Sequence, residues 1–269
     1  MDAVTFVIAE AGVNHGGNLD TAIEMVKWAK WAGADAVKFQ YFDSQRLWGD
    51  DRIKHLELDF TGLSLLELYC SKLGIEFMVT PFGVPEVEKM RELVKRWKVA
   101  SGCLERWPLL EAIRETRLPV IMSTGMAGVE RIGAALARLG YLQPGEYTQA
   151  YALLHCVSAY PCRVEDANLA AMDVLRHHHG HRCQIGYSDH TQGITVALAA
   201  VARGAQIIEK HLTLDRNAEG PDHKASIEPT EFRVMVSAIR TVEAALGDGV
   251  KRAQASERET MEAWYGDKR

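Results

Sequence analysis

The most constraining feature of this chain is a regular alternation between short apolar runs and longer segments with helical periodicity. Such an alternation is typical of parallel strands that are joined by helices. It occurs eight times, which is enough to close a cylinder of strands inside a ring of helices. The expected strands are 5–10, 36–40, 76–80, 98–101, 120–123, 152–156, 184–188 and 206–211. The expected helices are 18–32, 62–73, 84–96, 107–116, 128–139, 166–178, 192–203 and 229–246.

The length supports this interpretation. The chain has 269 residues, and one β/α barrel typically has about 250. The hydrophobic content of 47% and the charged content of 25% are ordinary for a globular protein. We therefore predict an α/β protein with a single (β/α)8 TIM barrel over residues 1–269 and no second domain.

Charge and cysteine content exclude several classes of partner. The formal net charge is −5 without a long basic or acidic block, so we expect neither nucleic acid nor a membrane surface as a partner. The five cysteines are scattered and contain no C-x-x-C pair, which is typical of reduced thiols. No apolar run approaches the ~18 residues of a membrane helix, and the first residues lack the basic start of a signal peptide. The expected localisation is cytoplasmic.

Polar residues gather where the expected strands end. In a β/α barrel the carboxyl ends of the strands form the catalytic face. Lys38 and Lys98, together with several hydroxyl groups, suit a small and highly anionic ligand that carries a phosphate. His190 and His211 close consecutive strands, so the two imidazoles can share one metal ion. The side chains at these ends are Glu10, Lys38, Gln40, Thr80, Lys98, Ser101, Ser123, Ser158, Tyr160, Ser188, His190, Glu209 and His211.

Six ordered segments resemble the sialic acid synthase family, whose members include N-acetylneuraminate, legionaminate and pseudaminate synthases. The segments are 8–17 (IAEAGVNHGG), 33–40 (GADAVKFQ), 123–126 (STGM), 154–161 (LHCVSAYP), 186–191 (GYSDHT) and 220–222 (GPD). The resemblance covers essentially the whole chain. It implies a barrel that condenses phosphoenolpyruvate with an N-acylated aminosugar aldehyde, giving a 2-keto-3-deoxy sugar acid and phosphate.

The resemblance also implies roles for individual residues. His190 and His211 match the metal ligands; Mn²⁺ is favoured over Mg²⁺ or Co²⁺, since Mg²⁺ prefers oxygen ligands. The catalytic candidates, one of which guides the attacking water, are Glu10, Glu209 and Asp222. The phosphoenolpyruvate ligands are Lys38, Lys98, Ser101, Ser123, Ser158 and Ser188. The sugar-facing residues are Asn14, Gln40 and Tyr160.

The chain departs from the family pattern in three places. Cys103 stands where the family has a glutamate after the fourth strand, so we predict that Glu105 substitutes for that carboxylate. We also predict that Arg106 replaces the arginine which the family's C-terminal domain contributes to the sugar. Ser158 stands where asparagine is common in the neuraminate enzymes. We also expect no C-terminal antifreeze-like domain, so a separate antifreeze-like cap protein becomes a predicted partner beside a homodimer.

Two alternatives stay open. One is an octulosonate- or heptulosonate-type synthase that acts on a phosphorylated aldose, for which Arg106 is the candidate ligand of the distal phosphate. The other is a non-catalytic barrel that serves as a partner or regulator of a full-length synthase. Cys103 favours the non-catalytic barrel, whereas the two lysines and the two histidines argue against it.

Overall fold

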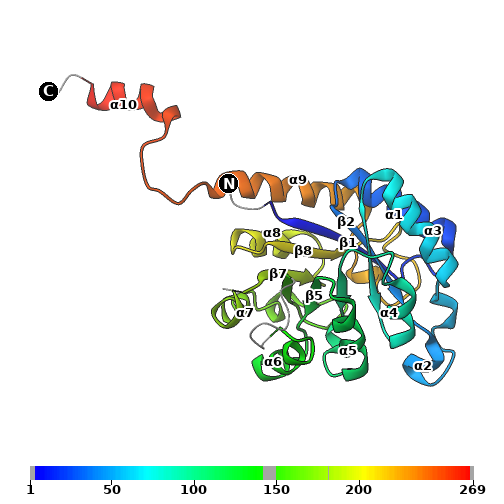
Figure 1. Ribbon diagram of the computed structural model, residues 1–269. Coiled ribbons are helices and arrows are strands. Elements are labelled where there is room, and N and C mark those ends of the chain that lie inside the picture. Colours follow the sequence, from blue (N-terminus) through cyan, green and yellow to red (C-terminus); the bar gives the residue numbers. More distant parts are fainter. Residues whose placement is uncertain (1–3, 142–149, 181, 267–269) are drawn as a thin grey trace.

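The computed structural model describes residues 4–141, 150–180 and 182–266. Eight parallel strands follow one another around a closed barrel, because β1 pairs with both β2 and β8. The predicted fold class is therefore confirmed (Figure 1). The strands are β1 (Phe6–Gly12), β2 (Ala36–Tyr41), β3 (Glu76–Pro81), β4 (Trp97–Val99), β5 (Val120–Ser123), β6 (Tyr151–His155), β7 (Gln184–Asp189) and β8 (Ile207–His211).

Helices follow the strands and cover the outside of the barrel (Figure 1). They are α1 (Leu19–Ala32), α2 (Ser44–Trp48), α3 (Phe60–Leu73), α4 (Val84–Met90), α5 (Trp107–Thr116), α6 (Val129–Arg138), α7 (Ala171–His179), α8 (Thr195–Ala202), α9 (Pro229–Leu246) and α10 (Arg258–Tyr265). Short 3₁₀ turns lie at Lys54–Leu56, Ser101–Cys103, Val164–Asp166, His223–Ala225 and Ala255–Glu257. Every helix in the described ranges is too short or too polar to span a bilayer.

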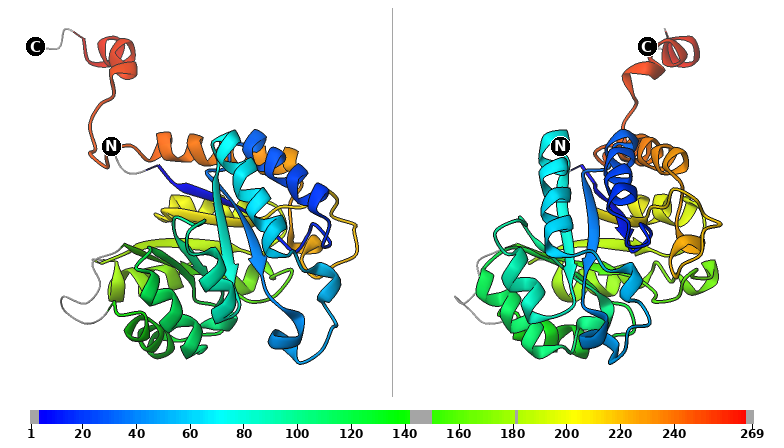
Figure 2. Two further views of the ribbon diagram at one scale, coloured as in Figure 1. Left: turned by 45° about the vertical axis from the view of Figure 1, so that its right-hand side comes forward. Right: turned by 90° about the vertical axis from the view of Figure 1, so that its right-hand side faces the viewer.

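The predicted boundaries are wrong in a few places. The helix predicted over 84–96 is α4 and ends at Met90, because the chain turns there and carries Val94 into the core beside Trp97. Two helices, α2 and α10, were not predicted. Figure 2 shows α10 standing clear of the barrel beyond α9, and its Trp264 is 75% exposed.

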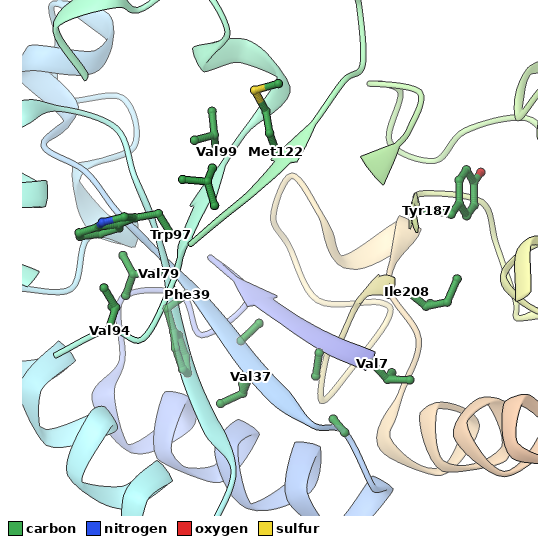
Figure 3. Close-up of a cluster of buried hydrophobic side chains, with 14 of the residues drawn as sticks. Val7, Val37, Phe39, Val79, Val94, Trp97, Val99, Met122, Tyr187 and Ile208 are labelled. Carbon is green, nitrogen blue, oxygen red and sulfur yellow. The ribbon is translucent and has the colours of Figure 1, made fainter. Parts of the chain in front are cut away.

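Side chains on each strand alternate between the helices and the barrel interior, as the pleat of a strand requires. The outward-facing side chains form the large core between barrel and helices, where Val7, Val37, Phe39 and Ile208 lie (Figure 3). The inward-facing side chains form a second, smaller apolar cluster that contains Ile8, Ala36, Met78, Ile121, Ala152, Leu154 and Ile207.

The inward-facing side chains become polar two residues further along each strand. Glu10, Lys38 and Glu209 follow the inward-facing Ile8, Ala36 and Ile207 at a spacing of two residues. The pairing register places Glu10 beside Lys38 on one side and beside His211 on the other. The closed barrel thus collects charged side chains at the carboxyl ends of its strands.

Candidate active site

A polar pocket lies at the carboxyl ends of the strands, with a free volume of about 90 Å³. It brings together most of the residues predicted from the sequence, and side chains from all eight strands or the loops after them contribute. The lining residues are Glu10, Lys38, Gln40, Thr80, Phe82, Lys98, Ala100, Ser101, Ser123, Cys156, Tyr160, Ser188, His190, Glu209, His211 and Asp222. We call this set the catalytic pocket.

Two lysines converge on one buried carboxylate at the bottom of the pocket. Lys98 Nζ lies 3.3 Å from Glu209 Oε1, and Lys38 Nζ lies 3.6 Å from Glu209 Oε2. Lys38 also pairs with Glu10, and it donates a hydrogen bond of 3.0 Å to Thr80 Oγ1. All four charged side chains are almost completely buried. The cluster therefore holds two cations in a place where water cannot screen them.

The carboxyl groups of the pocket differ in their affinity for protons. Burial raises the pKa of Glu10 to about 7, although Lys38 opposes the rise. Burial likewise raises the pKa of Asp222 to about 6, again against Lys38. Burial also disfavours the charge of Glu209, but Lys38 and Lys98 outweigh it and lower its pKa to about 2. Near neutral pH, Glu209 stays ionised while Glu10 and Asp222 can take up or release a proton.

Serine hydroxyls extend the set of hydrogen-bonding groups. Ser123 Oγ accepts from Lys98 Nζ at 2.7 Å, and Ser188 Oγ donates to Glu209 Oε1 at 2.8 Å. Ser101 Oγ accepts from the backbone N–H of Gly125 at 3.0 Å. A Cβ atom on residue 125 would come within 2.9 Å of that hydroxyl, so only glycine permits this approach. These hydroxyls and the two lysines give an anion both charge and directed hydrogen bonds.

The two histidines lie side by side at the rim, with ring centroids 5.5 Å apart. The backbone carbonyl of Val157 lies 2.6 Å from His190 Nδ1, and Ser188 Oγ lies 3.4 Å from Nε2. Within the described residues, Nδ1 of His211 has no hydrogen-bond partner. Burial lowers the pKa of both imidazoles, and the neutral form is the one that binds a metal.

This donor set fits a divalent metal held by two imidazoles, with carboxylates nearby. Asp222 Oδ2 lies 3.8 Å from His211 Nδ1. No group of three or more histidine, cysteine or acidic side chains in the described part of the chain is arranged to hold a metal. The predicted two-histidine site stays a prediction.

Side chains from the ends of β1 and β2 and from the loops after β6 and β8 meet on another side of the pocket. The Tyr160 ring lies 4.1 Å from the His190 ring and is partly exposed. A Cβ atom at Gly12 would come within 3.4 Å or less of Glu10, Gln40 and Asp222, so these three side chains meet around that glycine. Gly12 has φ +55° at an irregularity of β1, a conformation that glycine adopts without strain.

Four predicted site residues do not line the catalytic pocket. Asn14 is buried, and its Nδ2 donates to Leu212 O and to Ser226 Oγ, both at 2.8 Å. It therefore ties the loop after β1 to the loop after β8. Ser158 lies behind the pocket, beside Gly125. Glu105 and Arg106, in the turn after the fourth strand, are the other two.

The segment after β4 turns its charged residues away from the pocket. Glu105 is exposed and pairs with Arg131 at 3.1 Å. Arg106 lines a neighbouring groove, and its Nη1 donates to the carbonyl of Phe82 at 3.1 Å. Cys103 is 1% exposed, and burial raises the pKa of its thiol. The predicted replacement of a pocket carboxylate by Glu105 is thus not seen in this conformation.

The sequence analysis placed Thr80 at a strand end without giving it a role, and it missed Phe82, Ala100 and Cys156. Thr80 and Cys156 carried a usable signal, because they stand at the ends of expected strands. Phe82 and Ala100 carried none: they lie in the short segments after β3 and β4, and aromatic or small residues in such segments are common.

Comparisons with known proteins agree with this geometry. The model of the NeuB family matches residues 25–251. The N,N'-diacetyllegionaminic acid synthase of Campylobacter jejuni is 40% identical over 96% of this chain and 82% of its own length. The human N-acetylneuraminate-9-phosphate synthase is 35% identical over 92% of this chain and 72% of its own.

A solved structure is similar as well. The N-acetylneuraminic acid synthetase of Leptospira borgpetersenii, crystallised with citrate, has a TM-score of 0.87 and 39% identity, covering 96% of this chain and 90% of that one. The predicted resemblance is confirmed. So is the predicted enzyme class, a phosphoenolpyruvate-dependent synthase of 3-deoxy-2-ulosonic acids. The chain belongs to the NeuB family.

Proposed function

We propose that the chain joins phosphoenolpyruvate to the aldehyde carbon of an N-acylated aminosugar and releases phosphate. The observation that carries this proposal is the convergence of Lys38 and Lys98 on the buried Glu209 carboxylate. Phosphoenolpyruvate brings a phosphate and a carboxylate, which need cations and hydrogen-bond donors together. The related legionaminic acid synthase supports the choice of a sugar-acid product.

In the proposed reaction, C3 of phosphoenolpyruvate forms a bond to the aldehyde carbon of the sugar. Water adds at C2, and phosphate leaves as the bond between C2 and the bridging oxygen breaks. The water gives up both protons as C2 becomes a ketone: one reaches the former aldehyde oxygen, and the other leaves with the phosphate. Glu10 and Asp222 are suited to these transfers because their pKa values of about 7 and about 6 lie near neutral pH.

Glu209 has a different task in this proposal. Its carboxylate stays ionised and fixes the positions of Lys38 and Lys98 before the substrate arrives. Placing charges in advance avoids the cost of reorganising them during the reaction. Ser101, Ser123 and Ser188 complete the recognition of the phosphate and carboxylate groups, while Gln40 and Tyr160 face the sugar.

His190 and His211 are the proposed metal ligands, with Mn²⁺ preferred over Mg²⁺ or Co²⁺. When bound, such a metal supplies Lewis acidity toward a carbonyl oxygen. Val157 fixes the orientation of the His190 ring through its backbone carbonyl, which decides which ring nitrogen faces the pocket.

The test is phosphate release from phosphoenolpyruvate with Mn²⁺ and a panel of N-acylhexosamines, neutral aldoses and phosphorylated aldoses. Products are identified by mass spectrometry. We expect release that depends on an N-acylhexosamine and a product heavier than the sugar by one pyruvate unit. Lys98→Met should lower the rate by about 10³-fold, since loss of one preorganised donor costs roughly 10²–10³-fold. The matched control is Lys95→Met, which removes an exposed lysine near the same strand.

Release without any sugar, or none with any acceptor, would contradict the proposed condensation. The homodimer, the separate cap protein, the cytoplasmic localisation and the single domain over residues 1–269 stay predictions from the sequence.

A further inference from the structure

Asp222 reaches the catalytic pocket from a loop rather than from the end of a strand. It stands eleven residues after His211, yet it lines the pocket and is almost completely buried. Its carboxylate lies near that of Glu10 around Gly12, and its Oδ2 lies 3.8 Å from His211 Nδ1. A group that transfers a proton must stay within hydrogen-bond reach of the reacting atoms. The loop that carries Asp222 therefore has to be held in place.

A single side chain from another loop holds both ends of this segment. We call residues 212–226 the β8 loop, because they follow β8. Asn14, in the loop after β1, donates from Nδ2 to the carbonyl of Leu212 and to Ser226 Oγ, both at 2.8 Å. Ser226 Oγ in turn donates to the backbone carbonyl of Asp222 at 2.7 Å. A continuous chain of hydrogen bonds thus leads from Asn14 to the backbone of Asp222.

The orientation of the Asn14 amide is set by its partners. The carbonyl of Leu212 can only accept, so a turned amide would place two oxygen atoms against each other. Leu212 is held from its other side as well, because its N–H donates to the carbonyl of Glu10 at 2.8 Å. Since Leu212 directly follows His211, Asn14 also fixes the point where the chain leaves β8.

The connection lies where water does not compete with it. Asn14 and Ser226 are both buried, and hydrogen bonds are stronger in such surroundings than in water. Asn14 Oδ1 accepts no hydrogen bond from any described residue, which makes the burial of this amide costly. An apolar side chain would avoid that cost, but it would leave Leu212 and Ser226 unconnected.

A second tie holds the β8 loop without reaching the loop after β1. Thr213 Oγ1 lies 2.8 Å from Nδ1 of His223, the residue after Asp222. Both of these residues belong to the β8 loop. The tie through Asn14 differs, because it joins the β8 loop to the segment that follows Gly12. It therefore sets the position of Asp222 relative to the carboxyl group of Glu10.

From these contacts we infer that Asn14 and Ser226 are positioning residues, which hold Asp222 opposite Glu10 for the transfer of protons. Neither side chain lines the catalytic pocket, so both act through Asp222. This role differs from the sugar contact that the sequence predicted for Asn14. It rests on the proposed function, because it assumes that Asp222 takes part in the condensation.

The test is a double-mutant cycle on phosphate release. Asn14→Ala and Ser226→Ala should each lower kcat by about 10-fold to 100-fold, since a small displacement of a reacting group costs up to about 10²-fold. The KM for phosphoenolpyruvate should stay within about twofold, because the lysines and serines that bind it are unchanged. Asp222→Asn should lower kcat by about 10²–10⁴-fold.

The decisive readout is the coupling between these substitutions. In the Asp222→Asn background, adding Ser226→Ala or Asn14→Ala should change kcat by less than about twofold, because residues that act through one group are not additive. A general loss of structure would instead multiply with the loss from Asp222→Asn.

Ser44→Ala is the matched control. Ser44 is also buried, and its Oγ donates to the carbonyl of Asp50 at 2.7 Å in the segment after β2. The variant loses the same kind of bond from a loop that carries no proposed proton-transfer group. We expect kcat within about twofold of the wild type.

Hydrogen exchange measured by mass spectrometry on the full chain reports on the loop without any turnover. Asn14→Ala and Ser226→Ala should raise the exchange rate across the β8 loop by about tenfold or more, because local opening becomes easier. Ser44→Ala should leave the exchange of the β8 loop unchanged.

The positioning role is overturned if Asn14→Ala and Ser226→Ala keep the wild-type kcat, or if their losses multiply with that of Asp222→Asn. Unchanged exchange in both variants would equally overturn it. If the wild type releases no phosphate with any acceptor, the proposed reaction fails. Exchange then decides separately whether Asn14 and Ser226 hold the β8 loop.

Discussion

The catalytic pocket and the layer of outward-facing side chains around it both contain buried ion pairs. The two differ in how far their charged groups are satisfied by hydrogen bonds. On β7 and β8, Ser188 and Glu209 face the pocket, while their neighbours Asp189 and Lys210 face outward. Lys210 Nζ lies 2.9 Å from Asp189 Oδ2, and both side chains are completely buried. Lys210 also donates to the carbonyl of Thr191.

The outward pair has no unused acceptor. Asp189 Oδ1 accepts from the backbone N–H of Thr191 at 2.9 Å and from its hydroxyl at 2.7 Å. In the pocket, by contrast, Glu10 Oε1 accepts no hydrogen bond from any described residue. Because every group of the Lys210–Asp189 pair is satisfied, the pair fixes the register of β7 and β8. It thereby fixes the positions of the two histidines that follow or end these strands. A buried cluster with unused acceptors is prepared for a substrate.

The largest expected effect is a loss of activity when a lysine of the catalytic pocket is removed. Lys38→Met removes a cation from the pocket, so we expect turnover to fall by about 10³-fold or more while the protein stays folded. Steady-state phosphate release and circular dichroism check this. A variant that keeps more than a tenth of the wild-type rate would mean that Lys38 does not contact the substrate.

The second expected effect is a loss of stability when the outward-facing ion pair is broken. Lys210→Met leaves the Asp189 carboxylate buried and unpaired, so the free energy of unfolding should fall by about 3–5 kcal/mol. Adding Asp189→Leu should restore most of the loss, because an apolar pair no longer needs a counter-charge. Urea denaturation measures both. An unchanged midpoint in the single variant would refute the structural role of the pair.

A third prediction concerns the metal. Mn²⁺ at about 100 times its dissociation constant should stabilise the wild type by about 2.7 kcal/mol, since it binds only the folded chain. His190→Ala should abolish this gain, and a chelator should reverse it. The thermal midpoint with and without Mn²⁺ is the readout. Equal stabilisation of the variant would place the metal elsewhere.

The fourth prediction concerns the pH dependence of stability. Because the pKa of Glu10 is raised from 4.5 to about 7, the folded protein holds a proton that the unfolded chain has released between these values. Stability therefore falls as pH rises through this window, by at most about 1.4 kcal/mol per pH unit. Glu10→Gln removes this loss, so its stability relative to the wild type should increase from pH 5 to pH 7 and stay constant above.

Glu209→Gln provides the contrast. The pKa of Glu209 is lowered to about 2, so its ionised form contributes stability that is fully present above about pH 4.5 and is lost toward pH 2. Between pH 5 and 7 the stability of this variant should still fall with pH, but with a smaller slope than in the wild type, because Glu209 contributes to the raised pKa of Glu10 while burial, the larger cause, remains. Chelator in all samples keeps metal binding out of the comparison. Equal slopes for both variants would mean that the two carboxyl groups are not distinguished by their surroundings.

The sequence predicted the barrel because a parallel sheet buried on both faces produces apolar runs of characteristic length. It predicted Lys38, Lys98 and the two histidines because they stand at the carboxyl ends of expected strands, which meet on one face of a barrel. It did not predict where Glu105 and Arg106 point, since both lie in a turn after a strand of only three residues, and turn geometry depends on tertiary contacts. The place of Phe82 in the pocket wall required knowing that the loops after β3 and β4 lie side by side.

The most direct test of this account is calorimetric titration of phosphoenolpyruvate into the wild type, Lys98→Met and Lys210→Met, at a temperature where all three are folded. The account predicts that the wild type and Lys210→Met bind with similar affinity, and that Lys98→Met loses binding by at least tenfold. Binding that survives in Lys98→Met but is lost in Lys210→Met would contradict the assignment of the inner layer to the substrate and the outer layer to the scaffold.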